Sequence, residues 1–214
     1  MTSQEDITRI RVFYTKGESL RFTGHLDMQR LWERLLRRSG LPVRYSQGFH
    51  PRARLNLASA LPLGFTSEAE LLDFWMNKPR AIAEVQASLR ESAPPGLEIK
   101  EVYEVSLQED ALQVQMSASE FEVSFFDPQV KETLEEKVDF LLSQEEIVRK
   151  RRKKVYDLRP LILDLAVVDV TDGDPGLWMK LRAEQGATGR PDEVLNEMGF
   201  ENTEYMVTRT KLIL

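Results

Sequence analysis

The sequence contains no cysteine among its 214 residues. Disulfide bonds, zinc sites built on thiolates and cysteine-ligated iron–sulfur clusters are therefore excluded from this chain. Histidine is almost as scarce, with two residues, His25 and His50. A zinc site would have to recruit carboxylates, so we expect the chain to hold no metal and no cofactor.

Long apolar runs are missing as well. No run approaches the roughly 20 residues that a membrane-spanning helix needs, and the first residues lack the apolar core of a secretory signal. We therefore expect a cytoplasmic protein without a membrane partner. The motifs GxSxG, GxxxxGK[ST], GxGxxG and HExxH are absent too, so hydrolase, NTP-binding, dinucleotide-binding and zinc-protease functions have no motif support.

Positive charge is present, and it is concentrated. The chain carries a net charge of −6, yet eight arginines stand between Arg21 and Arg54 against two acidic residues. A second basic segment, "RKRRKK", runs from Arg149 to Lys154. Concentrated positive charge attracts polyanions, which indicates a nucleic-acid partner. The alternative is that the arginines of 30–38 only form the solvated face of a helix.

The hydrophobic pattern predicts the same order of elements in both halves of the chain. Alternation predicts strands at 7–14, 43–47, 54–60, 69–76 and 96–107, and helical spacing predicts helices at 25–39 and 79–92. The second half repeats this order, with a helix predicted at 128–143. We predict an α+β fold of two tandem ferredoxin-like (βαββαβ) domains with antiparallel sheets, spanning 1–108 and 118–214. One continuous α+β domain with a larger mixed sheet is the alternative.

The stretch "YSQGFHPRARLN", residues 45–56, is the first candidate for a site. Gly48 permits backbone conformations closed to other residues, and Pro51 stiffens the chain after His50. Aromatic side chains here can stack on bases while arginines pair with phosphates. The alternative is a structural turn with Phe49 in the core. The residues that we expect to bind nucleic acid, here and elsewhere, are Arg21, Arg44, Tyr45, Phe49, His50, Arg52, Arg54, Arg149, Arg151, Arg152, Lys153 and Lys154.

The other histidine, His25, stands at the start of the first predicted helix. Unpaired amide groups and the helix dipole favour anions at such a position, and Arg21 is near. The structural alternative is that Thr23 caps the helix and His25 merely lies in its first turn. If His25 and His50 converge in the fold, they are candidates for a catalytic acid–base pair.

The basic segment 149–154 is the second candidate. Alternation along a strand sends Arg149, Arg151 and Lys153 to one face and the intervening cations to the other. Because neither face then suits a core, we predict an exposed hairpin or edge strand that binds a phosphate backbone in a salt-dependent manner. The alternative is an edge strand whose charge protects it from aggregation.

Residues 20–76, with "HLD", "YSQGFHPR" and "LPLG", and the later "VYDLRPLI" and "RPDEVL…TRTKL", resemble the radical SAM-linked protein family. This family is also described as a domain of unknown function found beside or fused to a radical S-adenosylmethionine (radical SAM) protein. The sequence departs from the family at "PRARLNLA", near Arg54, where we expect a second proline and "SF". The resemblance implies a partner radical SAM protein, and the family has no established activity that carries over to this chain.

Three functions remain open at this point. The first is an RNA-binding accessory module that works with a partner radical SAM enzyme in tRNA or rRNA modification. The second is a metal-independent endoribonuclease that uses His25 and His50. The third is a protein adaptor for the radical SAM partner, docking through the acidic helix 128–143 without nucleic acid.

Overall fold

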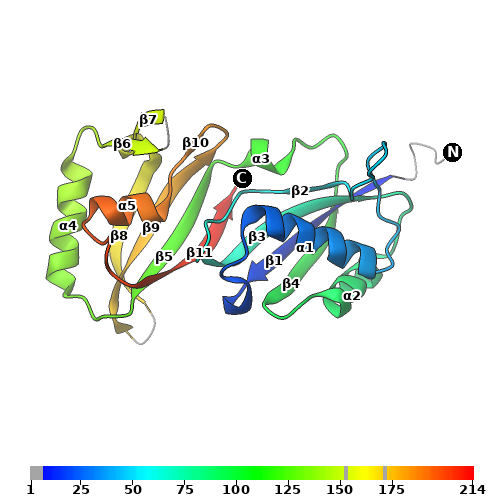
Figure 1. Ribbon diagram of the computed structural model, residues 1–214, viewed down its shortest axis with the longest axis horizontal. Helices are drawn as coiled ribbons and strands as arrows, with labels where there is room; N and C mark the ends of the chain where they lie inside the picture. Colours follow the sequence, from blue (N-terminus) through cyan, green and yellow to red (C-terminus); the bar gives the residue numbers. More distant parts are fainter. Residues whose placement is uncertain (1–6, 152–153, 171–172) are drawn as a thin grey trace. The chain divides into compact units, whose positions relative to one another are not determined.

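The computed structural model describes residues 7–151, 154–170 and 173–214. The chain divides into two compact units, Met1–Gln115 and Met116–Leu214. Both units combine helices with a mostly antiparallel sheet, so the fold is α+β (Figure 1). Within the described ranges, no helix is long and apolar enough to cross a membrane.

Over its described residues, 7–115, unit 1 carries four strands and two long helices. Its sheet has the order β4-β1-β3-β2, and every neighbouring pair is antiparallel. The elements are β1 (Thr8–Lys16), the 3-10 helix η2 (Glu18–Leu20), α1 (His25–Arg38), β2 (Leu55–Leu57), β3 (Thr66–Met76), α2 (Ile82–Ser92), β4 (Leu97–Val105) and the short α3 (Leu112–Gln115).

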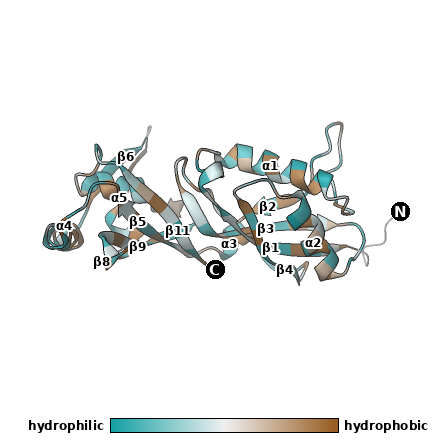
Figure 2. Ribbon diagram, turned by 90° about the horizontal axis from the view of Figure 1, so that it is seen from below, coloured by the Kyte–Doolittle hydropathy of each residue, from teal (hydrophilic) through white to brown (hydrophobic). Residues whose placement is uncertain are grey.

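The core of unit 1 lies between α1, α2 and one face of this sheet. Ile10 of β1 is paired with Phe74 of β3, so alternate residues of both strands point to the same side. Trp32 of α1 is fully buried against them, with its ring edge-on to Tyr14 at a centroid distance of 4.9 Å. Hydrophobic and hydrophilic residues alternate along α1 (Figure 2), as expected for a helix with one buried face.

Unit 2 has the strand order β11-β5-β9-β8, again antiparallel throughout, with the short β10 also paired to β9. Gly176 of β9 lies so close to β5 that a Cβ there would stand 2.4 Å from the carbonyl oxygen of Val123. The elements are β5 (Ala118–Phe125), α4 (Lys131–Ser143), β6 (Val148–Arg151), β7 (Lys154–Asp157), the 3-10 helix η3 (Arg159–Leu161), β8 (Ile162–Asp169), β9 (Pro175–Glu184), β10 (Ala187–Thr188), α5 (Pro191–Glu197) and β11 (Tyr205–Ile213).

The predicted elements are largely present, with shifted ends. The predicted helix at 25–39 is α1, and the predicted helix at 128–143 begins three residues later, as α4. The predicted strands at 43–47 and 54–60 are wrong in extent, because only 55–57 forms a regular strand. The residues before it pair through single bridges instead.

Candidate nucleic-acid interface

Residues 43–54, which we call the arm, form a hairpin that leads into β2. Tyr45 is bridged to Ala53. The amide of Ser46 donates to the carbonyl of Arg52 at 2.8 Å, and the amide of Arg54 donates to the carbonyl of Arg44 at 2.7 Å. The turn contains Gly48 at φ +136°, a conformation that side chains rarely adopt. The glycine therefore closes the turn, as the sequence predicts.

The base of the arm is fixed to β3 through Trp75. The Trp75 carbonyl accepts from the amide of Arg44 at 2.7 Å, and the Trp75 amide donates to the carbonyl of Arg54 at 3.2 Å. The Arg54 guanidinium carbon lies 4.4 Å from the centroid of the Trp75 ring, a cation–π contact. Burial lowers the pKa of Arg54, and the positive charges of Arg44 and Arg9 lower it further. Arg54 is therefore part of the arm's anchorage.

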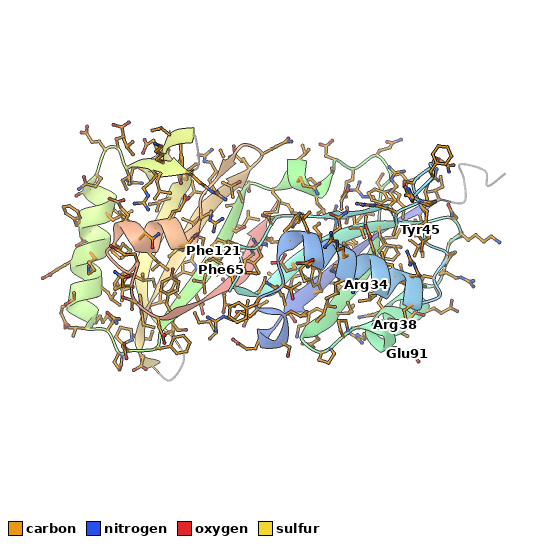
Figure 3. All side chains as sticks on the ribbon, in the orientation of Figure 1. Arg34, Arg38, Tyr45, Phe65, Glu91 and Phe121 are labelled. Atoms are coloured by element: carbon orange, nitrogen blue, oxygen red, sulfur yellow. The ribbon has the colours of Figure 1, made fainter. Side chains whose placement is uncertain are left out.

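The tip of the arm is open to solvent. Phe49 is 102% exposed, and the residues on either side of it are exposed too. The alternative that Phe49 is a core residue is thus wrong. Tyr45, labelled in Figure 3, is half-buried and packs against the core of unit 1, so its ring is a less accessible stacking surface than that of Phe49. His50 and Arg52 share the exposed tip with Phe49.

The outer face of α1 adds positive charge beyond the residues that the sequence pattern predicts to bind. Arg34, Arg37 and Arg38 are exposed near the end of the helix that leads to the arm. The guanidinium of Arg38 donates to the carbonyl of Ser92, at the end of α2 that also carries Glu91 (Figure 3). Between Glu33 and Glu68 the sequence has six arginines and no acidic residue. This acid-free interval is the sequence signal that points to the helix.

The two histidines lie at different places in unit 1. His25 is the first residue of α1, whereas His50 is in the arm, which follows the other end of that helix (Figure 1). A helix of this length spans about 20 Å. His25 lines a small cavity with Lys16 and Glu70, and His50 does not. The arrangement gives no support to a catalytic pair of the two histidines.

Arg21 contacts Gly64, which lies outside the arm. Its Nε donates to the carbonyl of Gly64 at 2.8 Å, and its own carbonyl accepts from the amide of Gly64 at 3.0 Å. The helix is capped by Gly24 without a side-chain hydrogen bond, so the alternative in which Thr23 caps the helix is wrong. Through these two hydrogen bonds Arg21 holds the chain at Gly64 in place. Its binding of nucleic acid stays a prediction.

The predicted basic hairpin is present as β6 and β7, which pair with each other. Its cations are partly neutralised within unit 2. Arg149 forms an ion pair with Glu197 at 2.9 Å, and Arg151 lies 3.9 Å from Glu193, both on α5. Lys150, on the opposite face of the strand, is exposed. Arg152, Lys153 and the side chain of Lys154 lie outside the described residues.

The "YDLRPL" motif beyond the hairpin has a structural role. Asp157 Oδ1 accepts the amides of Ile147 at 2.8 Å and Arg159 at 2.9 Å. The Arg159 guanidinium donates to three carbonyls, including that of Leu142 near the end of α4 at 3.1 Å. These contacts join the hairpin to α4. Over the described residues, no group of three or more His, Cys, Asp or Glu side chains is placed to hold a metal ion.

Comparison of the sequence with known protein families gives a match over most of the chain. Residues 9–191 match the model of a family described as "Uncharacterized protein conserved in bacteria (DUF2344)". The chain belongs to this family. No curated protein matches it.

Solved structures offer distant likenesses. The chain is similar to one in "Crystal Structure of a Cbf5-Nop10-Gar1 Complex", with a TM-score of 0.48 and 8% identity, over 96% of this chain and 48% of the other. It is similar to one in "Structure of H/ACA RNP bound to a substrate RNA containing 2'-deoxyuridine", with a TM-score of 0.44 and 8% identity, over 96% and 47%. This chain thus spans about half the length of those chains.

A third likeness covers both chains almost fully. It is to "Crystal structure of putative glycine cleavage system transcriptional repressor", with a TM-score of 0.27 and 11% identity, over 94% of this chain and 96% of the other. All these TM-scores are low, so the likenesses do not bear on what the DUF2344 chain binds.

Proposed function

We propose that this DUF2344 chain is an RNA-binding accessory module that works with a partner radical SAM enzyme, in tRNA or rRNA modification. The observation that carries the RNA-binding part is the fully exposed Phe49 at the tip of an arm that has three arginines and no acidic residue. The partner rests on the resemblance of residues 20–76 to the radical SAM-linked family.

The arm suits a single strand of RNA. Exposed arginines of the arm and of α1 pair with phosphates, while the ring of Phe49 stacks on a base. Such stacking tolerates any base, because every base has a π-face. Positive charge concentrated in one interval attracts the strand although the whole chain is acidic. The proposed site residues in unit 1 are Arg34, Arg37, Arg44, Phe49, His50, Arg52 and Arg54.

The strand orders support a finer fold assignment within the same proposal. Unit 1 has the strand order β4-β1-β3-β2, and unit 2 has the order β11-β5-β9-β8 when the β6–β7 hairpin and the short β10 are left aside. Numbered along the chain, both are the order fourth, first, third, second, with a helix between the first and second strands and another between the third and fourth. This is the order of a ferredoxin-like βαββαβ sandwich. These strand orders support our proposal of two tandem ferredoxin-like domains, spanning 1–108 and 118–214.

Binding of a fluorescently labelled single-stranded RNA, followed by anisotropy, tests the proposal. We expect Phe49→Ala to weaken binding by roughly 5- to 100-fold, which corresponds to one stacked base. The matched control is Phe140→Ala, because Phe140 of α4 is also an exposed aromatic residue, at 68%. Equal binding by wild type and Phe49→Ala, or an equal loss in both variants, would contradict the role of the arm.

Docking onto the partner enzyme is a second candidate function. The outer face of α4 carries exposed acidic residues, including Glu136 and Asp139, around Phe140. An exposed aromatic residue within an acidic rim suits a basic protein surface. Co-purification of the chain with the proposed radical SAM partner tests this. Loss of the enzyme in Phe140→Ala, and its retention in Phe49→Ala, would support docking through α4.

A further inference from the structure

Unit 2 contains a cleft that the proposed RNA contacts of unit 1 do not use. Its volume is about 420 Å³, within the range of roughly 300 to 1,000 Å³ typical of small-molecule sites. The walls come from the β6–β7 hairpin, from η3 and from the turn between β9 and β10. The residues on which the argument depends are Arg151, Tyr156, Asp157, Leu161 and Ala187.

Arg151 supplies a cation at this cleft. Its Nε is 3.9 Å from Glu193 Oε1, whereas Arg149 has a carboxylate oxygen at 2.9 Å. Half of the Arg151 side chain is exposed. Glu193 is moreover engaged by a second donor, because the hydroxyl of Tyr156 donates to its Oε2. The guanidinium of Arg151 is therefore only loosely held and keeps N–H groups for an anion.

The remaining walls suit a flat group that bears hydrogen-bond donors. The hydroxyl of Tyr156 is committed to Glu193, so the ring of Tyr156 and the side chain of Leu161 offer apolar surface. Asp157 uses its Oδ1 for two backbone amides. Among the described residues no donor lies on Oδ2, which leaves one carboxylate oxygen for an amino or hydroxyl group.

One class of ligand combines these three features. A phosphate matches the guanidinium, a planar base matches the apolar walls, and an exocyclic amino group or a ribose hydroxyl matches the carboxylate. From this geometry we propose that the cleft of unit 2 binds one nucleotide unit, with its phosphate on Arg151 and a donor group on Asp157. The nucleotide is either free or part of an RNA strand. This site goes beyond the arm and does not depend on it.

Calorimetric titration of the full chain with the four ribonucleoside 5′-monophosphates tests the proposal. We expect binding of at least one of them, weakened about tenfold or more in Arg151→Gln, because a charge-assisted hydrogen bond is removed. Lys150→Gln is the matched control, since it removes the same charge from the opposite face of the same strand and should bind as wild type does. Ala187→Trp, which fills the cleft without changing its charge, should abolish binding.

Further titrations separate the possible sources of the ligand. Binding of RNA trinucleotides but not of mononucleotides, abolished in Ala187→Trp and kept in Phe49→Ala, would place the nucleotide within a strand. Inorganic phosphate that binds as tightly as the nucleotides would overturn the proposal, as would no binding of either nucleotide probe. The arm is tested by Phe49→Ala and the cleft by Arg151→Gln and Ala187→Trp, so the two proposals fail separately.

Discussion

Asp73 is a fully buried carboxylate in the middle of β3, and two arginines of β1 surround it. Its Oδ2 accepts from Arg9 Nη2 at 2.5 Å, and its Oδ1 accepts from Arg11 Nε at 2.8 Å. Asp73→Ala would leave both guanidinium groups buried beside each other without this counter-charge. We expect a loss of about 3–5 kcal/mol in the free energy of unfolding of unit 1. Urea unfolding followed by tryptophan fluorescence in a Trp178→Phe background, in which only Trp32 and Trp75 of unit 1 emit, measures it.

Asp27→Ala is the control for this prediction. Asp27 also pairs with an arginine, Arg30, at 3.1 Å, but both side chains are about two-thirds exposed. Exposed pairs three residues apart on a helix contribute at most about 0.5 kcal/mol. If the two variants were destabilised by similar amounts, burial of the Asp73 pair would not be the source of its effect.

Tyr156 makes the stability of unit 2 sensitive to alkaline pH. Burial raises its pKa, and the hydrogen bond to Glu193 raises the pKa further. An unfolded tyrosine ionises near pH 10, so the contribution of Tyr156 is fully present below about pH 10 and declines as the pH rises above it. We expect the free energy of unfolding to fall less steeply above pH 10 in Tyr156→Phe than in wild type.

The measurement is a series of urea titrations between pH 8 and pH 11, followed by circular dichroism. The free energy of unfolding of Tyr156→Phe still falls to some degree above pH 10, because burial also raises the pKa of Tyr103 and of Tyr205. If the free energy of unfolding falls equally steeply with pH in wild type and Tyr156→Phe, the Tyr156–Glu193 contact does not cause the loss of stability above pH 10.

Among the elements, α4 begins without a capping side chain. Its N-cap residue is Val130, which has extended backbone angles and is 61% exposed. An aspartate there would accept a hydrogen bond from an unpaired amide of the first turn and would favour the positive end of the helix dipole. We expect Val130→Asp to stabilise unit 2 by about 1 kcal/mol. Thermal unfolding measures the gain, and Val130→Ala, which supplies no acceptor, should show none.

The elements also show how far prediction from sequence reaches. The helix from His25 to Arg38 is predictable because leucines recur at helical spacing and Gly40 follows. The arm is predictable as a turn, from Gly48 and Pro51, but its anchorage on Trp75 depends on a residue 21 positions beyond Arg54. Local patterns do not encode such distant contacts. The position of the arm is therefore predictable from the sequence, whereas the extent of the regular strand that follows it, β2, is not.

The basic segment 149–154 illustrates the same limit in unit 2. Alternation predicts a hairpin with cations on both faces, and β6 and β7 form that hairpin. The neutralising carboxylates, however, come from α5, more than forty residues later in the chain. A charge count along the sequence treats this segment and the acid-free interval around the arm as equivalent. The tertiary contacts distinguish them, since within the described ranges no arginine of the arm forms an ion pair with a carboxylate, whereas Arg149 and Arg151 meet Glu197 and Glu193.

At the scale of the whole molecule, an acidic chain is proposed to bind an acidic polymer. This requires that local charge, and not net charge, governs the interaction. Arg37→Gln combined with Arg52→Gln removes two exposed charges near the proposed strand and changes the net charge from −6 to −8. We expect weaker binding and a plot of log affinity against log salt concentration that is shallower by about 1.4, at roughly 0.7 for each phosphate of a single strand that no longer meets an arginine.

Arg182→Gln combined with Lys211→Gln gives the same change in net charge at residues of unit 2 that belong neither to the arm nor to the lining of the cleft. If local charge governs binding, this double variant keeps the wild-type slope of log affinity against log salt concentration and nearly the wild-type affinity, because neither side chain contacts a phosphate. Anisotropy titrations of labelled RNA between 50 and 200 mM KCl compare the three proteins. An equal reduction of slope in both double variants would mean that the strand responds to the charge of the molecule as a whole, and the arm would then have no special place in binding.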